Sequence, residues 1–164
     1  MISIQRIKIG EGELFKNIRL QSLQESPYAF GSSYEAALER SPESWNEQAD
    51  STAQGSDRAT FIAFEEGLPV GITALYRDQQ KPDFGELLQV WVTPKYRGAG
   101  LAARILDTVI HWGKENGFRT ILAGVTKDNE RALRFYQKHG FEITDIRATE
   151  DLGGFYLVKE LQFE

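Results

Sequence analysis

The sequence predicts a mixed α+β fold, with a mostly antiparallel central sheet flanked by helices. Strand-like segments at 58–65 and 68–76 are joined by Glu66-Gly67, a dipeptide typical of β-hairpins. After them, strand-like and helix-like patterns alternate, and the chain ends on two more strand-like segments. Hairpins followed by strand–helix alternation favour an α+β sheet over a purely parallel one.

The first third of the chain predicts one strand and two helices. Alternating apolar residues predict a strand over 2–9, and helical spacing predicts an amphipathic helix that ends near Pro27. Ser33 is placed to cap a second, short helix over 34–39. The following segment, 41–57, is polar with Trp45 as its one large apolar residue, and we expect a loop there.

The second half begins with an apolar run at 84–92, rich in residues that favour strands. Pro94 ends this run because proline has no N–H to give to a sheet. Helical patterns follow at 101–116 and 130–139, the second capped by Asp128 or Asn129. Gly140 suits a left-handed helix end, and strands are expected at 120–125, 141–147 and 154–161.

The composition is that of an ordinary globular domain. We expect one domain over 1–164, and no run approaches the ~20 apolar residues of a membrane span. The chain has no cysteine and two histidines, so we expect neither disulfides nor a metal centre. A net charge of −5 argues against nucleic-acid or membrane partners, and the start does not resemble a signal peptide, so we expect a cytoplasmic protein.

A glycine-rich turn joins the 84–92 strand to the next helix. The first turn of a helix has N–H groups without internal partners and therefore attracts anions. Small residues leave room for a phosphate to touch this backbone, and Arg97 adds a cation; the small residues are Gly98, Ala99, Gly100 and Ala102. The pattern favours a pyrophosphate site, although the two glycines would also suit a plain tight turn.

Two other phosphate-binding motifs fit less well. A Walker loop needs Gly-Lys-Ser/Thr, but Leu101 and Ala102 follow Gly100. A dinucleotide fingerprint would have its third glycine at Ala103, and it normally opens the first βαβ unit of a chain rather than lying past the midpoint.

Together these residues resemble a known family, the GCN5-related N-acetyltransferases (GNAT). The turn matches the family's Arg/Gln-x-x-Gly-x-Gly/Ala motif, and residues 129–141 match a second family block. The resemblance covers nearly the whole chain and implies the acyl-CoA N-acyltransferase fold with acetyl-CoA as co-substrate. It implies a cofactor site made of Val90, Trp91, Val92, Arg97, Gly98, Ala99, Gly100, Leu101, Ala102, Asn129 and Tyr136.

N-acetylation must first supply a neutral amine. An amine of pKa ~10.4 is neutral in about one molecule in a few thousand at pH 7, so a proton acceptor helps. Glu86 opens the central strand, and a period of two would place it on the face of Leu88, Val90 and Val92. The resemblance implies a strand-borne glutamate as base; a solvated strand end or an anchor for a cationic substrate are the alternatives.

Tyr136 is the candidate proton donor. A phenol of pKa ~10 is protonated at pH 7 and can serve a thiolate leaving group, and Tyr136 follows Asn129 at the family's spacing. The alternative is a core tyrosine. Asn129 either caps its helix or, as the resemblance implies, contacts the cofactor.

The acceptor is expected to be a small-molecule or peptide amine. Without cysteine, the amine should attack the thioester directly in a ternary complex. The resemblance implies an acceptor pocket over the first helices, for which the candidates are Tyr28, Phe30 and Trp91, together with Glu25, Tyr34 and Trp45. Packing in the core is the alternative for the aromatic residues. An acyl-CoA-binding sensor and a transferase with another acyl donor are the alternative functions, and the resemblance implies that homodimers are frequent.

Overall fold

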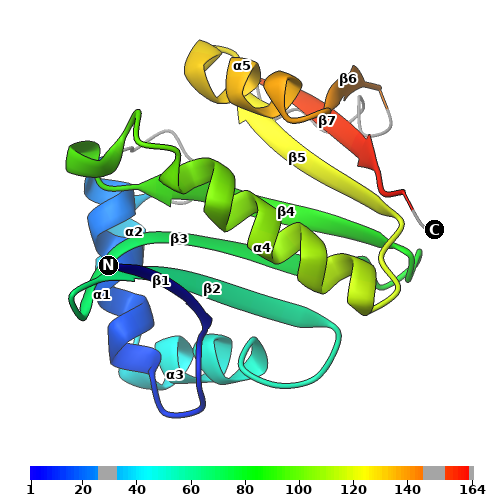
Figure 1. Cartoon of the computed structure of the whole chain (residues 1–164). Helices are drawn as coiled ribbons and strands as arrows, with labels where there is room; N and C mark the ends of the chain where they lie inside the picture. The colour runs from blue at the N-terminus through cyan, green and yellow to red at the C-terminus, as the bar shows by residue number, and fades with distance from the viewer. Residues whose placement is uncertain (26–32, 146–153, 163–164) are drawn as a thin grey trace.

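The computed structural model describes residues 1–25, 33–145 and 154–162 (Figure 1). The elements of the first half are β1 (Ile2–Arg6), α1 (Gly12–Glu25), α2 (Tyr34–Leu38), α3 (Pro42–Ser51), β2 (Arg58–Glu65) and β3 (Leu68–Arg77). Those of the second half are β4 (Phe84–Val92), the 3-10 turn η1 (Pro94–Tyr96), α4 (Leu101–Glu115), β5 (Thr120–Thr126), α5 (Glu130–Lys138), β6 (Glu142–Thr144) and β7 (Gly154–Glu160).

The described strands form one sheet in the order β1-β2-β3-β4-β5-β7-β6. Every neighbouring pair is antiparallel except β4 and β5, which are parallel, and this confirms the predicted fold class. The β2–β3 hairpin turns through Glu66 and Gly67, both with positive φ, as a type I′ turn requires. The first strand is shorter than predicted and ends at Arg6.

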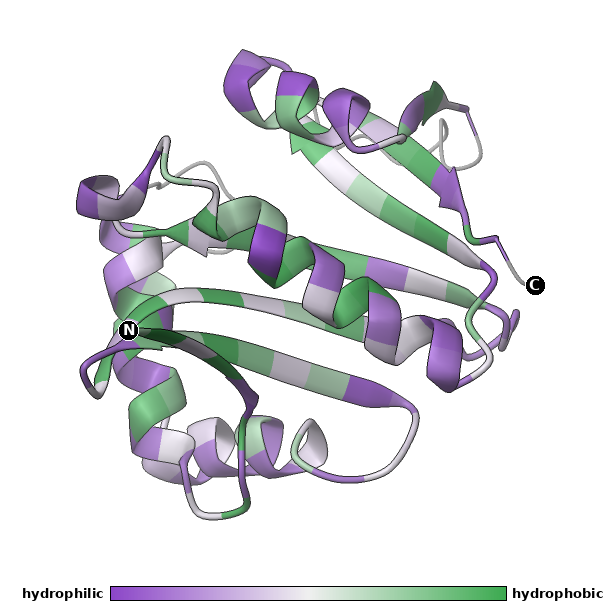
Figure 2. Ribbon diagram, in the orientation of Figure 1, coloured by the Kyte–Doolittle hydropathy of each residue, from purple (hydrophilic) through white to green (hydrophobic). Residues whose placement is uncertain are grey.

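Helices cover both faces of the sheet, and each face has its own apolar core. Helix α4, in front of the sheet in Figure 1, packs Leu106 and Val109 onto Leu75 and Leu87. Helices α1–α3 cover the other face, where Phe15, Ile18, Trp45 and Ala49 meet Ile62, Ile72 and Trp91. Figure 2 shows apolar residues along much of the central strands and a mixture of polar and apolar residues along the helices. No helix in the described ranges has the length and apolar character needed to cross a membrane.

Helix α3 replaces the loop predicted over 41–57, so that expectation was wrong. The Ser41 hydroxyl accepts a hydrogen bond from the Ser44 N–H at 3.1 Å, and Pro42 occupies the first turn, where proline is tolerated. Trp45 and Ala49 lie one turn apart and are both buried. Because only these two residues form its apolar stripe and the other positions are mostly polar, the helical period could not be recognised in the sequence.

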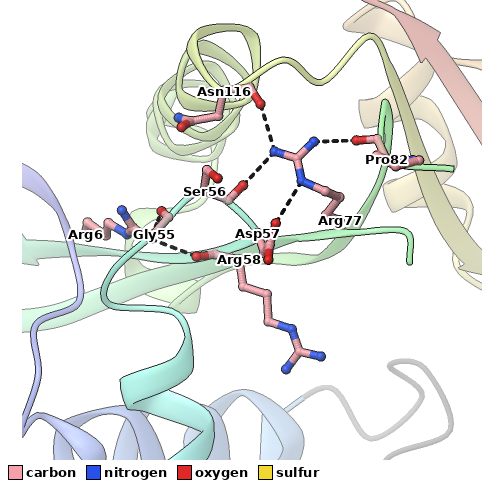
Figure 3. Close-up of polar contacts among 8 residues, drawn as sticks. All are labelled: Arg6, Gly55, Ser56, Asp57, Arg58, Arg77, Pro82 and Asn116. Atoms are coloured by element: carbon pink, nitrogen blue, oxygen red, sulfur yellow. Dashed lines mark hydrogen bonds and ion pairs between the residues drawn. The ribbon is translucent and has the colours of Figure 1, made fainter. Parts of the chain in front are cut away.

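Two half-buried arginines hold the loop that leads into β2 (Figure 3). The Arg77 guanidinium bonds Asp57 at 3.1 Å and donates to the carbonyls of Ser56 at 2.7 Å, Asn116 at 2.8 Å and Pro82. From the other side, Arg6 donates to the carbonyls of Thr52, Gly55 and Arg58. Arg77 therefore joins the end of α4, the β3–β4 turn and the start of β2, which are distant in sequence.

We expect Arg77→Met to lower the free energy of unfolding by about 2–4 kcal/mol, because its carbonyl partners would lose charge-assisted donors in a half-buried setting. Urea denaturation measures this change. Arg104→Met, at an exposed position of α4, should stay within about 0.5 kcal/mol of the parent protein. Equal effects of the two substitutions would contradict the structural role of Arg77.

Candidate functional site

The site begins where β4 and β5 separate. Their parallel pairing runs from Phe84–Thr120 to Leu87–Ala123 and then stops. Strand β4 continues to Val92 alongside β3, and β5 continues to Thr126 alongside β7. Figure 1 shows the two strands diverging in this direction. The last residues of β4 therefore have one edge without a strand partner, and backbone groups on that edge are available to a ligand.

A β-bulge in the same part of β4 changes which side chains share a face. Ile72 pairs with Trp91 but Ala74 pairs with Leu88, so β4 has one extra residue here. The buried hydroxyl of Thr73 donates to the Leu88 carbonyl at 2.9 Å and fixes the bulge. No local pattern in the sequence predicted this contact between β3 and β4.

The bulge overturns the predicted alignment of Glu86 with Val90 and Val92. Val92 packs with Leu101 and Ile105 of α4, and Val90 packs against the same cluster, whereas Trp91 joins the core under α1–α3. Glu86 lies opposite Tyr76, on the face of Leu88 and Trp91. The strict period of two failed because one inserted residue reverses every side chain beyond it.

The glycine-rich turn leads into α4 as an uncapped helix start. Gly98 and Gly100 have φ of 83° and 82°, in the left-handed region that favours glycine. Gly100 is the N-cap residue and provides no side-chain hydrogen bond, so the first N–H groups of this 15-residue helix have no capping side chain. The space where a Cβ of either glycine would stand is open within 4 Å. The turn thus presents bare backbone to its surroundings.

A cavity of about 550 Å³ lies between this turn, the separated strands and α5. From the predicted cofactor set it is lined by Val90, Trp91, Val92, Arg97, Gly98, Gly100, Leu101, Ala102, Asn129 and Tyr136; Ala99 is exposed outside this lining. The charged side chains of the lining are Arg97, Arg131, Lys138 and Glu25. The cavity therefore carries an excess of positive charge in an acidic chain, which suits an anionic ligand.

Helix α5 places Tyr136 at the separation of the strands. Its C-terminus turns at Gly140, with φ of 91°, and the Phe141 N–H returns to the Tyr136 carbonyl at 3.0 Å, as predicted. Tyr136 is 3% exposed, and burial raises the pKa of its hydroxyl to about 12, while a backbone hydrogen bond from Val90 acts in the opposite direction. The phenol oxygen thus sits beside the free edge of β4.

The other candidate residues are distributed more widely. The Asn129 Oδ1 accepts from the Ala132 N–H at 3.1 Å and caps α5, which leaves its amide N–H groups for other contacts. Trp91 is 3% exposed, and its Nε1 donates to Glu25 at 2.8 Å. Glu86 is half-buried outside the cavity lining. Tyr28 and Phe30 lie outside the described residues.

Sequence reasoning missed the contribution of β5 to the cavity. Gly124, Val125 and Thr126 line it, as do Phe135 and Lys138 of α5. The end of β5 could have been found from its position next to β4, because ligands gather where parallel strands end. Only the separation of the strands makes these residues part of the site, and no local pattern encodes that separation.

The raised pKa of Tyr136 predicts a loss of stability in alkali. The unfolded chain releases this proton near pH 10 whereas the folded chain keeps it to about pH 12. The free energy of unfolding should therefore fall by up to about 1.4 kcal/mol per pH unit as pH rises from 10 to 12, and this contribution is intact below pH 10. Urea denaturation at pH 9, 10 and 11 should show a smaller decline for Tyr136→Phe; equal declines would contradict the assignment.

Comparison with known proteins identifies the family. Residues 20–141 match the model of the acetyltransferase (GNAT) family. An uncharacterised N-acetyltransferase of Mycobacterium bovis is 34% identical over 109 residues, 63% of this chain and 68% of that protein.

Solved structures share the fold over the length of the chain. A GNAT-family acetyltransferase of Streptococcus pneumoniae has a TM-score of 0.80 at 20% identity, covering 98% of this chain and 100% of the other. The PaiA N-acetyltransferase of Thermoplasma acidophilum, solved with coenzyme A, has a TM-score of 0.77 at 21% identity and covers 98% and 99%. With the family model matching most of its length, the chain belongs to the acetyltransferase (GNAT) family of enzymes.

Proposed function

We propose that the protein transfers an acetyl group from acetyl-CoA to a primary amine by direct attack within a ternary complex. The observation that carries the proposal is the cavity in which the uncapped start of α4, the free edge of β4 and the Tyr136 hydroxyl meet. The related fold of PaiA, whose structure contains coenzyme A, supports the same ligand class. We propose that residues 1–164 act as one catalytic domain.

The residues of the turn fit the diphosphate of coenzyme A. A diphosphate needs hydrogen-bond donors and positive charge. The turn offers the bare N–H groups at the start of α4, the open space beside Gly98 and Gly100, and the Arg97 guanidinium. Arg131 and Lys138 of α5 add positive charge to the cavity lining. The unpaired edge of β4 beyond Leu87 fits the amide groups of the pantetheine arm, as an added strand would. When bound, acetyl-CoA supplies an activated thioester carbonyl.

Two side chains would take part in proton transfer, Glu86 as the acceptor and Tyr136 as the donor. Glu86 is proposed to accept the proton of the incoming amine through water, or to attract the cationic amine, from the face of β4 opposite to Val90. Tyr136 keeps its proton on Oη at neutral pH because burial raises its pKa to about 12. It can hand that proton to the departing sulfur as the C–S bond breaks. It can then recover a proton from the attacking nitrogen, which carries a positive charge once the C–N bond has formed and is therefore a far stronger acid than a phenol.

The proposed acceptor is a primary amine that can enter the strand separation and attack the thioester carbonyl. Release of free thiol from acetyl-CoA, measured over a panel of small amines, amino acids and peptides, would identify it. Thiol release that no amine accelerates would favour an acyl-CoA-binding role without transfer.

Ala102 tests the diphosphate site without straining the turn. It lies in the first turn of α4 and lines the cavity, and leucine is nearly as good a helix former as alanine. We expect Ala102→Leu to weaken coenzyme A binding at least tenfold in calorimetric titration, because its side chain would occupy the space of the phosphates. Ala102→Ser, which stays small, should bind within about threefold of the parent protein; parent-like binding by Ala102→Leu would place the ligand elsewhere.

Tyr136→Phe tests the proton donor. The ring and its packing remain while the proton is lost, so kcat should fall roughly 10- to 1,000-fold with little change in coenzyme A affinity. Steady-state kinetics with the best amine of the panel measures this, and unchanged turnover would remove Tyr136 from the mechanism.

Glu86→Gln tests whether Glu86 accepts the proton of the amine. Loss of a base should flatten the acidic limb of the pH–rate profile, which Tyr136→Phe should leave in place. An unaltered limb in Glu86→Gln would move the base to another group.

A further inference from the structure

Glu25, the last residue of α1, lines the cavity and contacts the glycine-rich turn through Arg97. Its Oε2 accepts from the Trp91 Nε1 at 2.8 Å and from an Arg97 Nη2 at 2.6 Å. The side chains of Glu25 and Arg97 are only 30% and 25% exposed. One carboxylate oxygen thus joins α1, the bulged end of β4 and the turn before α4.

A carboxylate is an unexpected member of an anion-binding cavity. Among the described residues that line it, Glu25 is the only acidic side chain, beside the cations Arg97, Arg131 and Lys138. A negative charge so close to the start of α4 opposes the binding of a diphosphate by Coulomb repulsion. The Glu25 carboxylate is therefore expected to have a function that outweighs this repulsion or makes use of it.

The contacts of Arg97 define that role. Its Nε donates to the Val92 carbonyl at 3.1 Å and its Nη2 to Glu25, so two of the five guanidinium N–H groups are held by the protein. The remaining three have no partner among the described residues, and the two bonds hold the guanidinium in a fixed orientation. Glu25 both fixes the guanidinium and neutralises much of its charge.

We propose that Glu25 is a positioning residue that sets the strength of coenzyme A binding, by orienting Arg97 while offsetting its charge. This inference rests on the proposed function, because it assumes that the diphosphate lies at the turn. An acyltransferase must release coenzyme A in every turnover, so a diphosphate site weakened by one carboxylate favours product release.

Glu25→Gln separates the effect of the negative charge from that of the side-chain shape. Glutamine keeps the size and one acceptor oxygen, so the net charge beside the diphosphate rises by one with little change in shape. With the Arg97 guanidinium between Glu25 and a bound phosphate, the Coulomb energy of one unit charge, taken between the limits of water and a protein surface, corresponds to a roughly three- to fifty-fold change in affinity. We therefore expect tighter binding of coenzyme A by Glu25→Gln.

Calorimetric titration of the full chain with coenzyme A tests the inference at low salt and at 1 M NaCl. The Kd of Glu25→Gln should fall by roughly three- to fifty-fold at low salt, and the gain should shrink at 1 M, where the Debye length is about 3 Å. Glu13→Gln, an equal charge change at the exposed first turn of α1, should bind like the parent protein. Glu25→Asp, which keeps the charge, should stay within about threefold of it.

Unchanged or weaker binding by Glu25→Gln would overturn the inference, as would a gain that salt does not reduce. Should Glu25→Gln fail to fold, a large loss of affinity in a folded Glu25→Asp would likewise overturn it, because orientation and not charge would then dominate. A parent protein that binds no coenzyme A would refute the proposed function first and this inference with it. A parent protein that binds normally, with no gain in Glu25→Gln, would refute only the inference.

Discussion

Loss of hydrogen bonding between β4 and β5 after Leu87 is the constraint on which the site depends. A backbone N–H or C=O inside a protein needs a partner, and each of these strands keeps its other neighbour while it loses the one between them. A side chain satisfies one of the freed backbone groups: the Tyr136 hydroxyl accepts a hydrogen bond from the Val90 N–H. The strand separation thus accommodates the Tyr136 hydroxyl. It also leaves an edge of β4 along which an extended ligand could bind as an additional strand would.

The rest of the fold fixes that opening from both sides. The bulge held by Thr73 turns Trp91 toward α1, where Glu25 joins it to the turn before α4. At the other end of α4, the Arg77 guanidinium joins the Asn116 carbonyl to the Ser56 carbonyl before β2 and so holds the C-terminal end of the helix against the sheet. The position of the first turn of α4 therefore depends on contacts at both ends of the helix.

Local signals in the sequence predicted much of this architecture. Glu66-Gly67 predicted its hairpin, Gly140 its helix end, and the Gly98–Gly100 turn the start of α4, because each is determined by the backbone preferences of one or two residues. Helix α3 was missed because only Trp45 and Ala49 mark its buried stripe. The facing of Glu86 was wrong because a bulge of one residue is invisible to a period-two pattern. The Glu25–Arg97 pair joins positions far apart in the chain, and no local rule encodes it.

Backbone amide shifts in a coenzyme A titration followed by ¹⁵N NMR test the central claim most directly, because they report the ligand's position without requiring catalysis. If the ligand lies in the strand separation, perturbations should concentrate on the first turn of α4 at Leu101 and Ala102, on Val90 to Val92, and on Tyr136. Amides of α3, on the other face of the sheet, should move little. Shifts confined to α3, or none at the start of α4, would contradict the account.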